Sequence, residues 1–146
     1  MHSATAQLDD LLADAFSCGS ASEALIASSE QKLGLLFGTT YRLFLSRFGA
    51  SLLTGFELYG LPPETDPNQP PQWTSAVNAT LRLRPDCLPK DSVQISHDGM
   101  DHGFFLKCSK TDPFFDGPVI EWGPRFEGEE VIAPNFIAFV ARRLGR

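Results

Sequence analysis

Apolar side chains near the start of the chain recur at helical spacing and predict two helices. Over residues 4–16 they fall on one face, which indicates a short amphipathic helix. These side chains are Leu8, Leu11, Leu12, Ala15 and Phe16. Ser20 and Glu23 have the spacing of a capping box, in which a serine caps the helix and a glutamate follows one turn later. A second helix is therefore expected from this point to about Leu33.

The next segment has the most regular helical pattern of the chain. Its apolar positions follow the i, i+3, i+4, i+7 spacing of one helix face. They are Tyr41, Phe44, Leu45 and Phe48. Thr39 or Thr40 is in position to cap this helix, and Gly49 is in position to end it. A short apolar strand over residues 56–59 follows, and Gly60 ends it. The pattern itself includes no catalytic acid, base or nucleophile. It therefore favours a protein that acts by binding a partner.

Prolines and an ambiguous stretch occupy the middle of the chain. Five prolines lie between residues 62 and 72 and predict an irregular loop inside one domain. Residues 73–84 fit a helix, because several apolar and small side chains share a helical face. The same residues also alternate between apolar and polar side chains, as a strand does. Both interpretations stay open from the pattern alone.

Short apolar or alternating runs bounded by Asp, Gly and Pro predict strands in the second half of the chain. They cover residues 92–96, 104–107, 118–122 and 131–132. Hairpin loops are expected between the first three of these strands, at residues 98–103 and 112–117.

A closing helix is predicted with Pro134 in its first turn, a position that suits proline. Its apolar face consists of Phe136, Phe139, Val140 and Leu144, and its last turns carry Arg142, Arg143 and Arg146. The predicted fold class is therefore α+β, with N-terminal helices, an antiparallel or mixed sheet of four to six strands, and a C-terminal helix packed on the sheet.

Composition narrows the class of protein. A chain of 146 residues is long enough for one domain with its own core, and 42% hydrophobic residues with twelve Phe exclude a disordered chain. The apolar runs are too short for a membrane span, and the first residues do not resemble a signal peptide, so we expect a cytoplasmic protein. Cys18, Cys87 and Cys108 are widely spaced, which indicates buried reduced thiols and no zinc or redox motif.

The negative net charge of the chain favours some classes of binding partner over others. The formal net charge is −6 and the sequence pI is about 4.9. Such a balance disfavours non-specific nucleic-acid binding, which needs clustered cations. It is compatible with a basic protein partner, although simple solubility explains it as well.

One local group of side chains is competent to bind a metal ion. His97, Asp98, Asp101 and His102 lie close together in sequence, but their spacing matches neither a calcium loop nor a helical zinc pair. A polar hairpin turn explains them better. The chain also has no Gly-x-Ser-x-Gly motif and no phosphate-binding glycine loop. We therefore expect no metal, no cofactor and no enzymatic activity; a small metal-dependent hydrolase that uses this loop is the least favoured hypothesis.

Several motifs occur in the order that is typical of one known superfamily. In the first half they are Glu30, Leu33, Gly34, Tyr41, Arg42, Phe44, Leu45, Gly49, Gly60 and Leu61. In the second half they are Leu88-Pro89, Val93-Gln94-Ile95, Asp98-Gly99, Phe104 to Leu106, Pro118 to Trp122, and Asn135-Phe136 with Phe139-Val140. From about residue 20 to its end, the chain resembles the SUKH superfamily, which includes Smi/Knr-type yeast cell-wall regulators and many bacterial immunity proteins.

The resemblance implies both a domain organisation and a function. It implies a helix at residues 73–84, an N-terminal helical extension over residues 1–19 and a single SUKH-like domain over residues 20–146. It also implies a non-enzymatic binding protein that neutralises a cognate toxin, such as a nuclease, by occlusion. The alternative is a regulatory or scaffolding module of the Smi/Knr type. The expected partner is a protein, with no nucleic acid and no membrane; no oligomeric state is predicted.

A binding surface is expected where acidic residues accumulate in the second half of the chain. Predicted strand ends and hairpin loops hold most of them, so several of them could share one rim of the sheet. The acidic candidates are Asp98, Asp101, Asp116, Glu121, Glu127, Glu129 and Glu130. A charged edge that blocks aggregation is an alternative explanation for the glutamate run. Trp122 is the predicted apolar contact, because tryptophan is enriched at binding hot spots, although core packing would explain it equally well.

Overall fold

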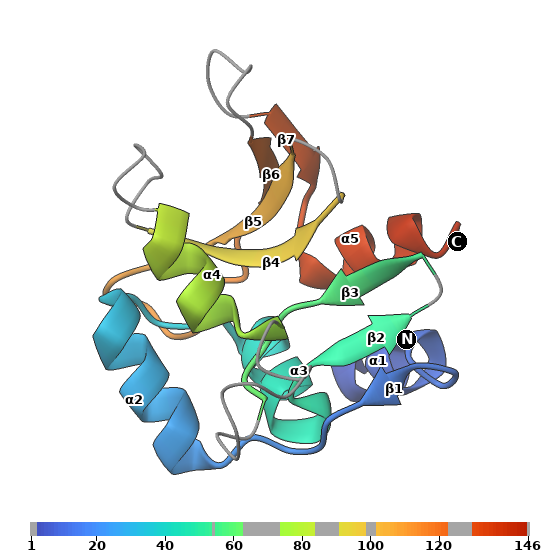
Figure 1. Cartoon of the computed structure of the whole chain (residues 1–146), viewed down its shortest axis with the longest axis horizontal. Coiled ribbons are helices and arrows are strands. Elements are labelled where there is room, and N and C mark those ends of the chain that lie inside the picture. Colours follow the sequence, from blue (N-terminus) through green and yellow to red (C-terminus); the bar gives the residue numbers. More distant parts are fainter. Residues whose placement is uncertain are drawn as a thin grey trace.

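The computed structural model describes residues 3–53, 55–62, 74–83, 91–98, 102–122 and 130–145. Within these ranges the chain forms five helices and two antiparallel sheets (Figure 1). The helices are α1 (Ala4–Leu11), α2 (Glu23–Leu33), α3 (Thr39–Phe48), α4 (Ala76–Leu83) and α5 (Phe136–Arg143). No helix in the described ranges is long and apolar enough to cross a membrane.

The seven strands are divided between a three-stranded and a four-stranded sheet. The first has the order β1 (Phe16–Ser17), β2 (Ser51–Leu53) and β3 (Phe56–Leu58). The second has the order β4 (Ser92–His97), β5 (Gly103–Lys107), β6 (Val119–Trp122) and β7 (Glu130–Ala133). The α+β class is confirmed, as are the C-terminal helix against the sheet and the four strands of the second half. The short strand β2 was not predicted.

The two sheets meet where β3 passes β4 (Figure 1). The backbone N–H of Tyr59 donates to the carbonyl of Ile95 at 2.7 Å. The Ser96 hydroxyl donates to the carbonyl of Glu57 at 2.6 Å. These two bonds join the end of the first sheet to the edge of the second, so the strands of both sheets surround one main core.

The aromatic stripe of α3 packs on α5 in that core. Tyr41, Phe44 and Leu45 are at most 1% exposed. The Phe136 ring of α5 lies 5.1 Å from the Tyr41 ring and 5.2 Å from the Phe44 ring, measured between centroids. Phe139 and Val140 are equally buried, whereas Phe48 is only partly buried at the border of the cluster. Strands β4, β5 and β6 complete the core with Val93, Ile95, Phe104, Leu106 and Val119.

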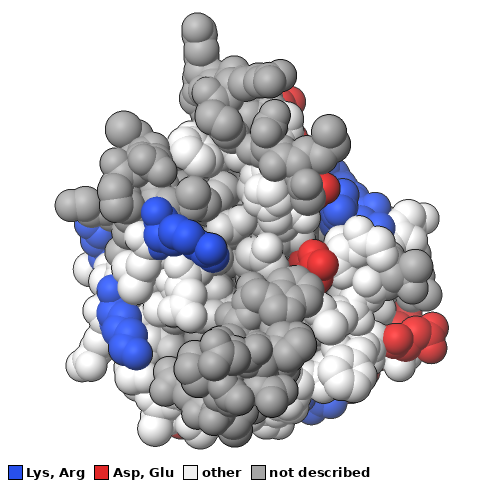
Figure 2. Space-filling model, in the orientation of Figure 1, with Lys and Arg blue, Asp and Glu red and all other residues white. Residues whose placement is uncertain are grey.

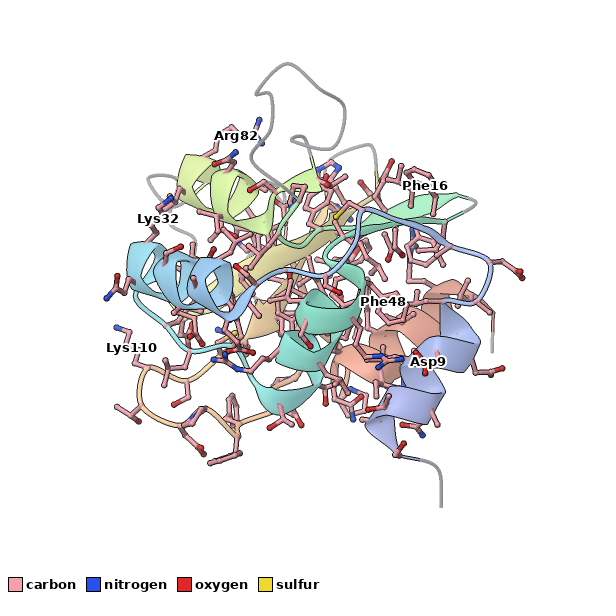
Figure 3. The ribbon with its side chains drawn as sticks, turned by 90° about the horizontal axis from the view of Figure 1, so that it is seen from below. Asp9, Phe16, Lys32, Phe48, Arg82 and Lys110 are labelled. Carbon is pink, nitrogen blue, oxygen red and sulfur yellow. The ribbon has the colours of Figure 1, made fainter. Side chains whose placement is uncertain are left out.

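The first helix is shorter than predicted. It ends at Leu11, and Phe16 lies instead in β1, where its side chain is 72% exposed. The reason is strand pairing, because β1 pairs with β2 and directs Phe16 away from the core. The helix itself is docked, since Leu8 is fully buried and Arg47 on α3 donates to both carboxylate oxygens of Asp9 at 2.8 and 2.9 Å (Figure 3).

Three helix starts differ from the predicted ones. Ser22, and not Ser20, caps α2 and accepts the N–H of Leu25 at 3.1 Å. Asn135 caps α5, so that Pro134 precedes the helix. Neither threonine caps α3, whose N-cap is Gly38. The Asp116 carboxylate serves this helix start from far along the chain, because its Oδ1 accepts the N–H of Thr40 at 2.8 Å.

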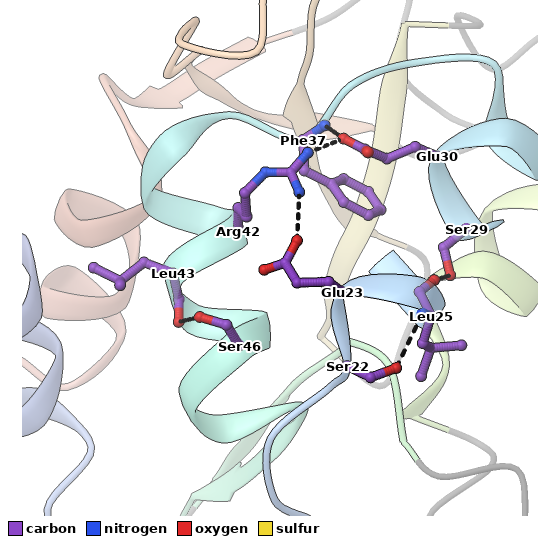
Figure 4. A network of polar contacts seen from close by, with 9 residues as sticks. All are labelled: Ser22, Glu23, Leu25, Ser29, Glu30, Phe37, Arg42, Leu43 and Ser46. Carbon is purple, nitrogen blue, oxygen red and sulfur yellow. Dashed lines mark hydrogen bonds and ion pairs between the residues drawn. The ribbon is translucent and has the colours of Figure 1, made fainter. Parts of the chain in front are cut away.

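A buried carboxylate fixes α2 against α3 (Figure 4). Glu30 accepts the backbone N–H of Phe37 at 2.8 Å and also accepts a hydrogen bond from the guanidinium of Arg42. The side chain of Glu30 is only 10% exposed, so the paired cation and the backbone donor compensate for its burial. Gly34 ends α2 in the left-handed conformation with φ 71°, as the sequence predicted.

The middle of the chain is described in part. Residues 76–83 form the helix α4, which confirms the choice that followed the family resemblance. The predicted proline loop lies outside the described residues except at its first residue, Pro62. Trp73 and Arg146 also lie outside them.

Candidate functional site

Four of the predicted binding residues lie at one end of the four-stranded sheet: Asp98, Glu121, Trp122 and Glu130. The strands are antiparallel, so the end of β4, the start of β5, the end of β6 and the start of β7 share that end. Gly103 lies opposite both His97 and Trp122, and Glu121 lies opposite Glu130. We call the residues Asp98, His102, Glu121 and Glu130 the acidic end of the sheet.

A histidine links two of these carboxylates. His102 Nδ1 lies 3.0 Å from Glu121 Oε1 and 3.8 Å from Asp98 Oδ2. Asp98 Oδ1 also accepts the backbone N–H of His102 at 3.1 Å, which closes the turn between β4 and β5. The side chain of Glu121 is 23% exposed and Glu130 is exposed. The acidic end is therefore held by local hydrogen bonds and is open to a partner.

The charge pattern around this end is mixed. On the face shown in Figure 2, acidic side chains form small separate groups, and basic ones lie mainly on the side of α2 and α4 and near α5. An interface at the acidic end would therefore be a localised patch. Its carboxylates would act on the rate of association more than on the final affinity.

Trp122 packs mainly within its own sheet. Its ring meets the Phe105 ring edge to face, with centroids 6.0 Å apart. Phe105 and Ile120 form a second small apolar cluster against which the partly buried Trp122 lies. The indole is only partly covered, so both roles considered from the sequence, packing and partner contact, remain available to it.

Of the other acidic candidates, one lies elsewhere and three are not among the described residues. Asp116 lies in the connection between β5 and β6, at the opposite end of the sheet, where its carboxylate caps α3. It is exposed, yet its hydrogen bond to Thr40 gives it a structural role. Asp101, Glu127 and Glu129 lie outside the described residues.

The described residues offer no evident catalytic group. In these ranges no three or more His, Cys, Asp or Glu side chains are arranged to hold a metal ion. Burial raises the pKa of the Cys108 thiol to about 12, and burial also raises the pKa of Cys18. Both thiols therefore stay protonated at neutral pH, which makes them poor nucleophiles. Cys87 lies outside the described residues.

Sequence reasoning missed an exposed aromatic residue in a well-ordered loop. Ser109 Oγ accepts the N–H groups of Thr111 and Asp112 at 3.1 and 2.9 Å, and Asp112 Oδ1 accepts the N–H of Phe114 at 2.9 Å. The side chain of Phe114 is 78% exposed. The sequence contained a signal for this exposed side chain. Phe114 and Phe115 are adjacent in a predicted turn, where two neighbouring aromatic side chains cannot easily both point into the core.

Sequence reasoning also missed a cavity of about 360 Å³ between α4, β3 and β4. It is lined by Tyr59, Ala79, Arg82, Gln94 and His97. These residues come from three separate elements, so no spacing along the chain reveals the site. From the sequence, Gln94 was considered only as part of a predicted strand, and His97 only as part of the metal-competent group.

Comparison with known proteins places the chain in a family. No curated protein matches it. The model of the family SUKH_5, described as SMI1-KNR4 cell-wall, matches residues 1–144. This match extends the resemblance to the N-terminal helix α1 and also covers the acidic end of the sheet. Because it covers nearly the whole chain, the protein belongs to the SUKH_5 family of the SUKH superfamily.

Proposed function

We propose that this protein is a non-enzymatic binding protein that protects a bacterial cell by neutralising a protein toxin in the cytoplasm. The observation that carries the proposal is the family match over residues 1–144. Immunity proteins are common in the superfamily that the chain resembles. Membership of a fold family does not by itself determine function, so the proposal needs support from a surface and a direct test.

The mechanism would be occlusion by a preformed surface. Toxins that act on nucleic acid carry cations to hold phosphates. Carboxylates can occupy the same cations, and Asp98, Glu121 and Glu130 belong to one end of the four-stranded sheet. The net charge of −6 would favour encounter with such a toxin.

A second candidate is a regulatory or scaffolding module. The description of the family names the SMI1-KNR4 cell-wall proteins, which favours this alternative. The two functions differ in their partners, because an immunity protein binds one toxin whereas a regulator acts on the components of a cell-wall pathway. Deletion of the gene separates them: a regulator's loss sensitises cells to cell-wall stress in the absence of any toxin.

The direct test is co-expression with the product of the adjoining gene, the expected position of a cognate toxin. We expect that product to arrest growth alone and to be harmless with this protein. We also expect a stoichiometric complex of the two purified proteins by size-exclusion chromatography. The Phe44→Ala variant, which removes a fully buried ring, is the control with a destabilised fold. Arrest that persists in the presence of the folded protein, with no complex, would exclude this product as the toxin and leave the regulatory alternative.

A further inference from the structure

The cavity between α4, β3 and β4 contains two polar atoms, Gln94 Oε1 and the Tyr59 hydroxyl, for which the described residues supply no hydrogen-bond partner. We propose that it binds a small carboxylate whose neighbouring atom carries an N–H, the group found in N-acylated amino acids and at the carboxyl terminus of a peptide. The inference does not depend on the proposed toxin binding. It rests on the chemistry of Gln94, Tyr59 and Arg82.

Gln94 is the buried polar group of the cavity. It is only 4% exposed, and its Nε2 donates to the carbonyl of Ser96 at 3.2 Å. This bond leaves Oε1 as the free end of the amide, and no described residue donates to it. A buried amide oxygen without a donor costs stability, so an N–H supplied by a ligand would be favourable here.

Tyr59 and Arg82 supply donors to the same cavity. The Tyr59 hydroxyl has no hydrogen-bond partner in the described part of the chain. Burial and then Glu57 raise the pKa of Tyr59, while Arg82 opposes them, so the hydroxyl keeps its proton and can donate. Arg82 lies in the last turn of α4, and none of the described carboxylates forms an ion pair with it. A guanidinium and a hydroxyl together suit the two oxygens of a carboxylate.

The charges around the cavity favour a single negative charge over a phosphate dianion. His97, also on the wall, has its Nδ1 3.8 Å from Asp98 Oδ1. Any positive charge on this imidazole is therefore shared with a carboxylate. Arg82 is thus the main cation, and Glu57 and Asp98 would repel a second negative charge on the ligand. The volume of about 360 Å³ is near the lower limit for small-molecule sites, which indicates a small group.

The walls of the cavity are held in place before any ligand binds. The N–H of Gln94 donates to Thr80 Oγ1 at 2.8 Å, which joins β4 to α4. The N–H of Tyr59 donates to Ile95, and its carbonyl accepts the Tyr41 hydroxyl at 2.7 Å. A site whose groups are already fixed loses less entropy on binding.

The test is an NMR titration of the ¹⁵N-labelled full chain with N-acetylglycine. We expect saturable shifts of the Gln94 side-chain amide and of the backbone amides of Tyr59 and His97. Arg82→Gln should weaken binding by about tenfold or more, because a charge-assisted hydrogen bond is lost. Lys110→Gln makes the same change of charge far from the cavity and should leave the affinity unchanged (Figure 3). Circular dichroism checks that both variants are folded.

Two altered ligands test the contacts without changing the protein. N-acetylglycinamide lacks the carboxylate, and N-acetylsarcosine lacks the N–H, so both should bind at least about tenfold more weakly. The absence of saturable shifts, equal binding by Arg82→Gln, or equal binding of either altered ligand would each overturn the proposal. A capped tripeptide that ends in glycine identifies the source of the group: tighter binding than N-acetylglycine indicates a peptide terminus, and equal or weaker binding indicates a free acylated amino acid.

Discussion

The two ends of the four-stranded sheet use carboxylates in different ways. At the acidic end, Glu121 and Glu130 lie opposite each other on adjacent strands, and Glu121 faces His102. At the other end, Asp112 and Asp116 accept backbone N–H groups, those of Phe114 and Thr40 respectively. One end therefore holds like charges side by side, whereas the other uses its charges to fix a loop and a helix start.

The carboxylates at the two ends are expected to affect the stability of the fold differently. A carboxylate that accepts a backbone N–H at a helix start stabilises the fold, because it satisfies a donor and complements the helix dipole. Like charges directly opposite on neighbouring strands are mildly destabilising. Asp98 also accepts a backbone N–H, that of His102, but the facing pair Glu121 and Glu130 is harder to explain by folding alone, which is consistent with a role in binding.

A change in the core should cause the largest loss of unfolding free energy among the variants considered. Phe44 is fully buried on α3, the helix that Asp116 caps, and its ring stacks between those of Tyr41 and Phe48. Phe44→Ala should lower the free energy of unfolding by about 3–5 kcal/mol, through lost transfer energy and a cavity. Urea unfolding followed by circular dichroism measures this. A loss below about 1 kcal/mol would contradict the placement of the α3 stripe in the core.

Asp116 should contribute less than the core but more than any single residue of the acidic end. Asp116→Ala removes the acceptor of the Thr40 N–H and should lower the free energy of unfolding by about 0.5–2 kcal/mol. Asp116→Asn is the matched variant, because asparagine also caps helices well and should retain most of the stability. Equal losses in the two variants would mean that the charge matters more than the cap, and no loss in either would remove the distinction between the two ends.

Sequence reasoning succeeded where a local pattern determined the structure. The stripe of α3, the glycine at the end of α2 and the strands β4 to β7 all follow from spacing and turn residues within a few positions. It failed where a distant segment supplied the decisive contact. The carboxylate of Asp116, 76 residues from Thr40 in the sequence, accepts the N–H at the start of α3, where a threonine cap was predicted. Phe16 pairs with β2 and therefore lies in a strand, not in the predicted first helix. Neither contact leaves a local signal.

The positions of the candidate binding residues, like the elements of the fold, could be predicted only in part from the sequence. Hairpin connections between antiparallel strands were expected, and they bring Asp98, Glu121 and Glu130 to one end. The sequence could not separate Asp116 from this group, because an acidic residue in a loop has the same pattern whether it caps a helix or faces solvent. The cavity beside Gln94 depends on how α4 packs against β4, which spacing does not determine.

Removal of one charge at the acidic end should leave stability nearly unchanged. Glu130 is exposed and lies opposite Glu121, so Glu130→Gln relieves a like-charge contact. The free energy of unfolding should stay within about 0.5 kcal/mol of wild type, with any change towards higher stability and smaller in high salt. Urea unfolding at two salt concentrations measures it. A loss of more than about 1 kcal/mol would show that this carboxylate stabilises the fold, as those at the other end do.

The last prediction concerns association, where the proposed function expects the acidic end to matter while stability hardly changes. Reversing Glu130 of the acidic end to Lys, together with Glu127 and Glu129 just before it in the sequence, should slow association with the toxin and flatten the dependence of that rate on salt, because charges at the border of an interface act mainly on encounter. Stopped-flow mixing with the partner identified by co-expression measures the rate across a salt series. Asp112→Lys, at the opposite end of the sheet, controls for net charge alone.

The control decides what a slower rate means. If only the triple variant associates more slowly, the acidic end contacts the partner or lies beside the contact. If Asp112→Lys slows association as much for each charge reversed, the overall charge steers the encounter and no particular end is implicated. If the triple variant associates at the wild-type rate across the series and still protects cells, the acidic end is not the binding surface. The exposed Phe114, held in its loop by Asp112, would then be the first residue to replace.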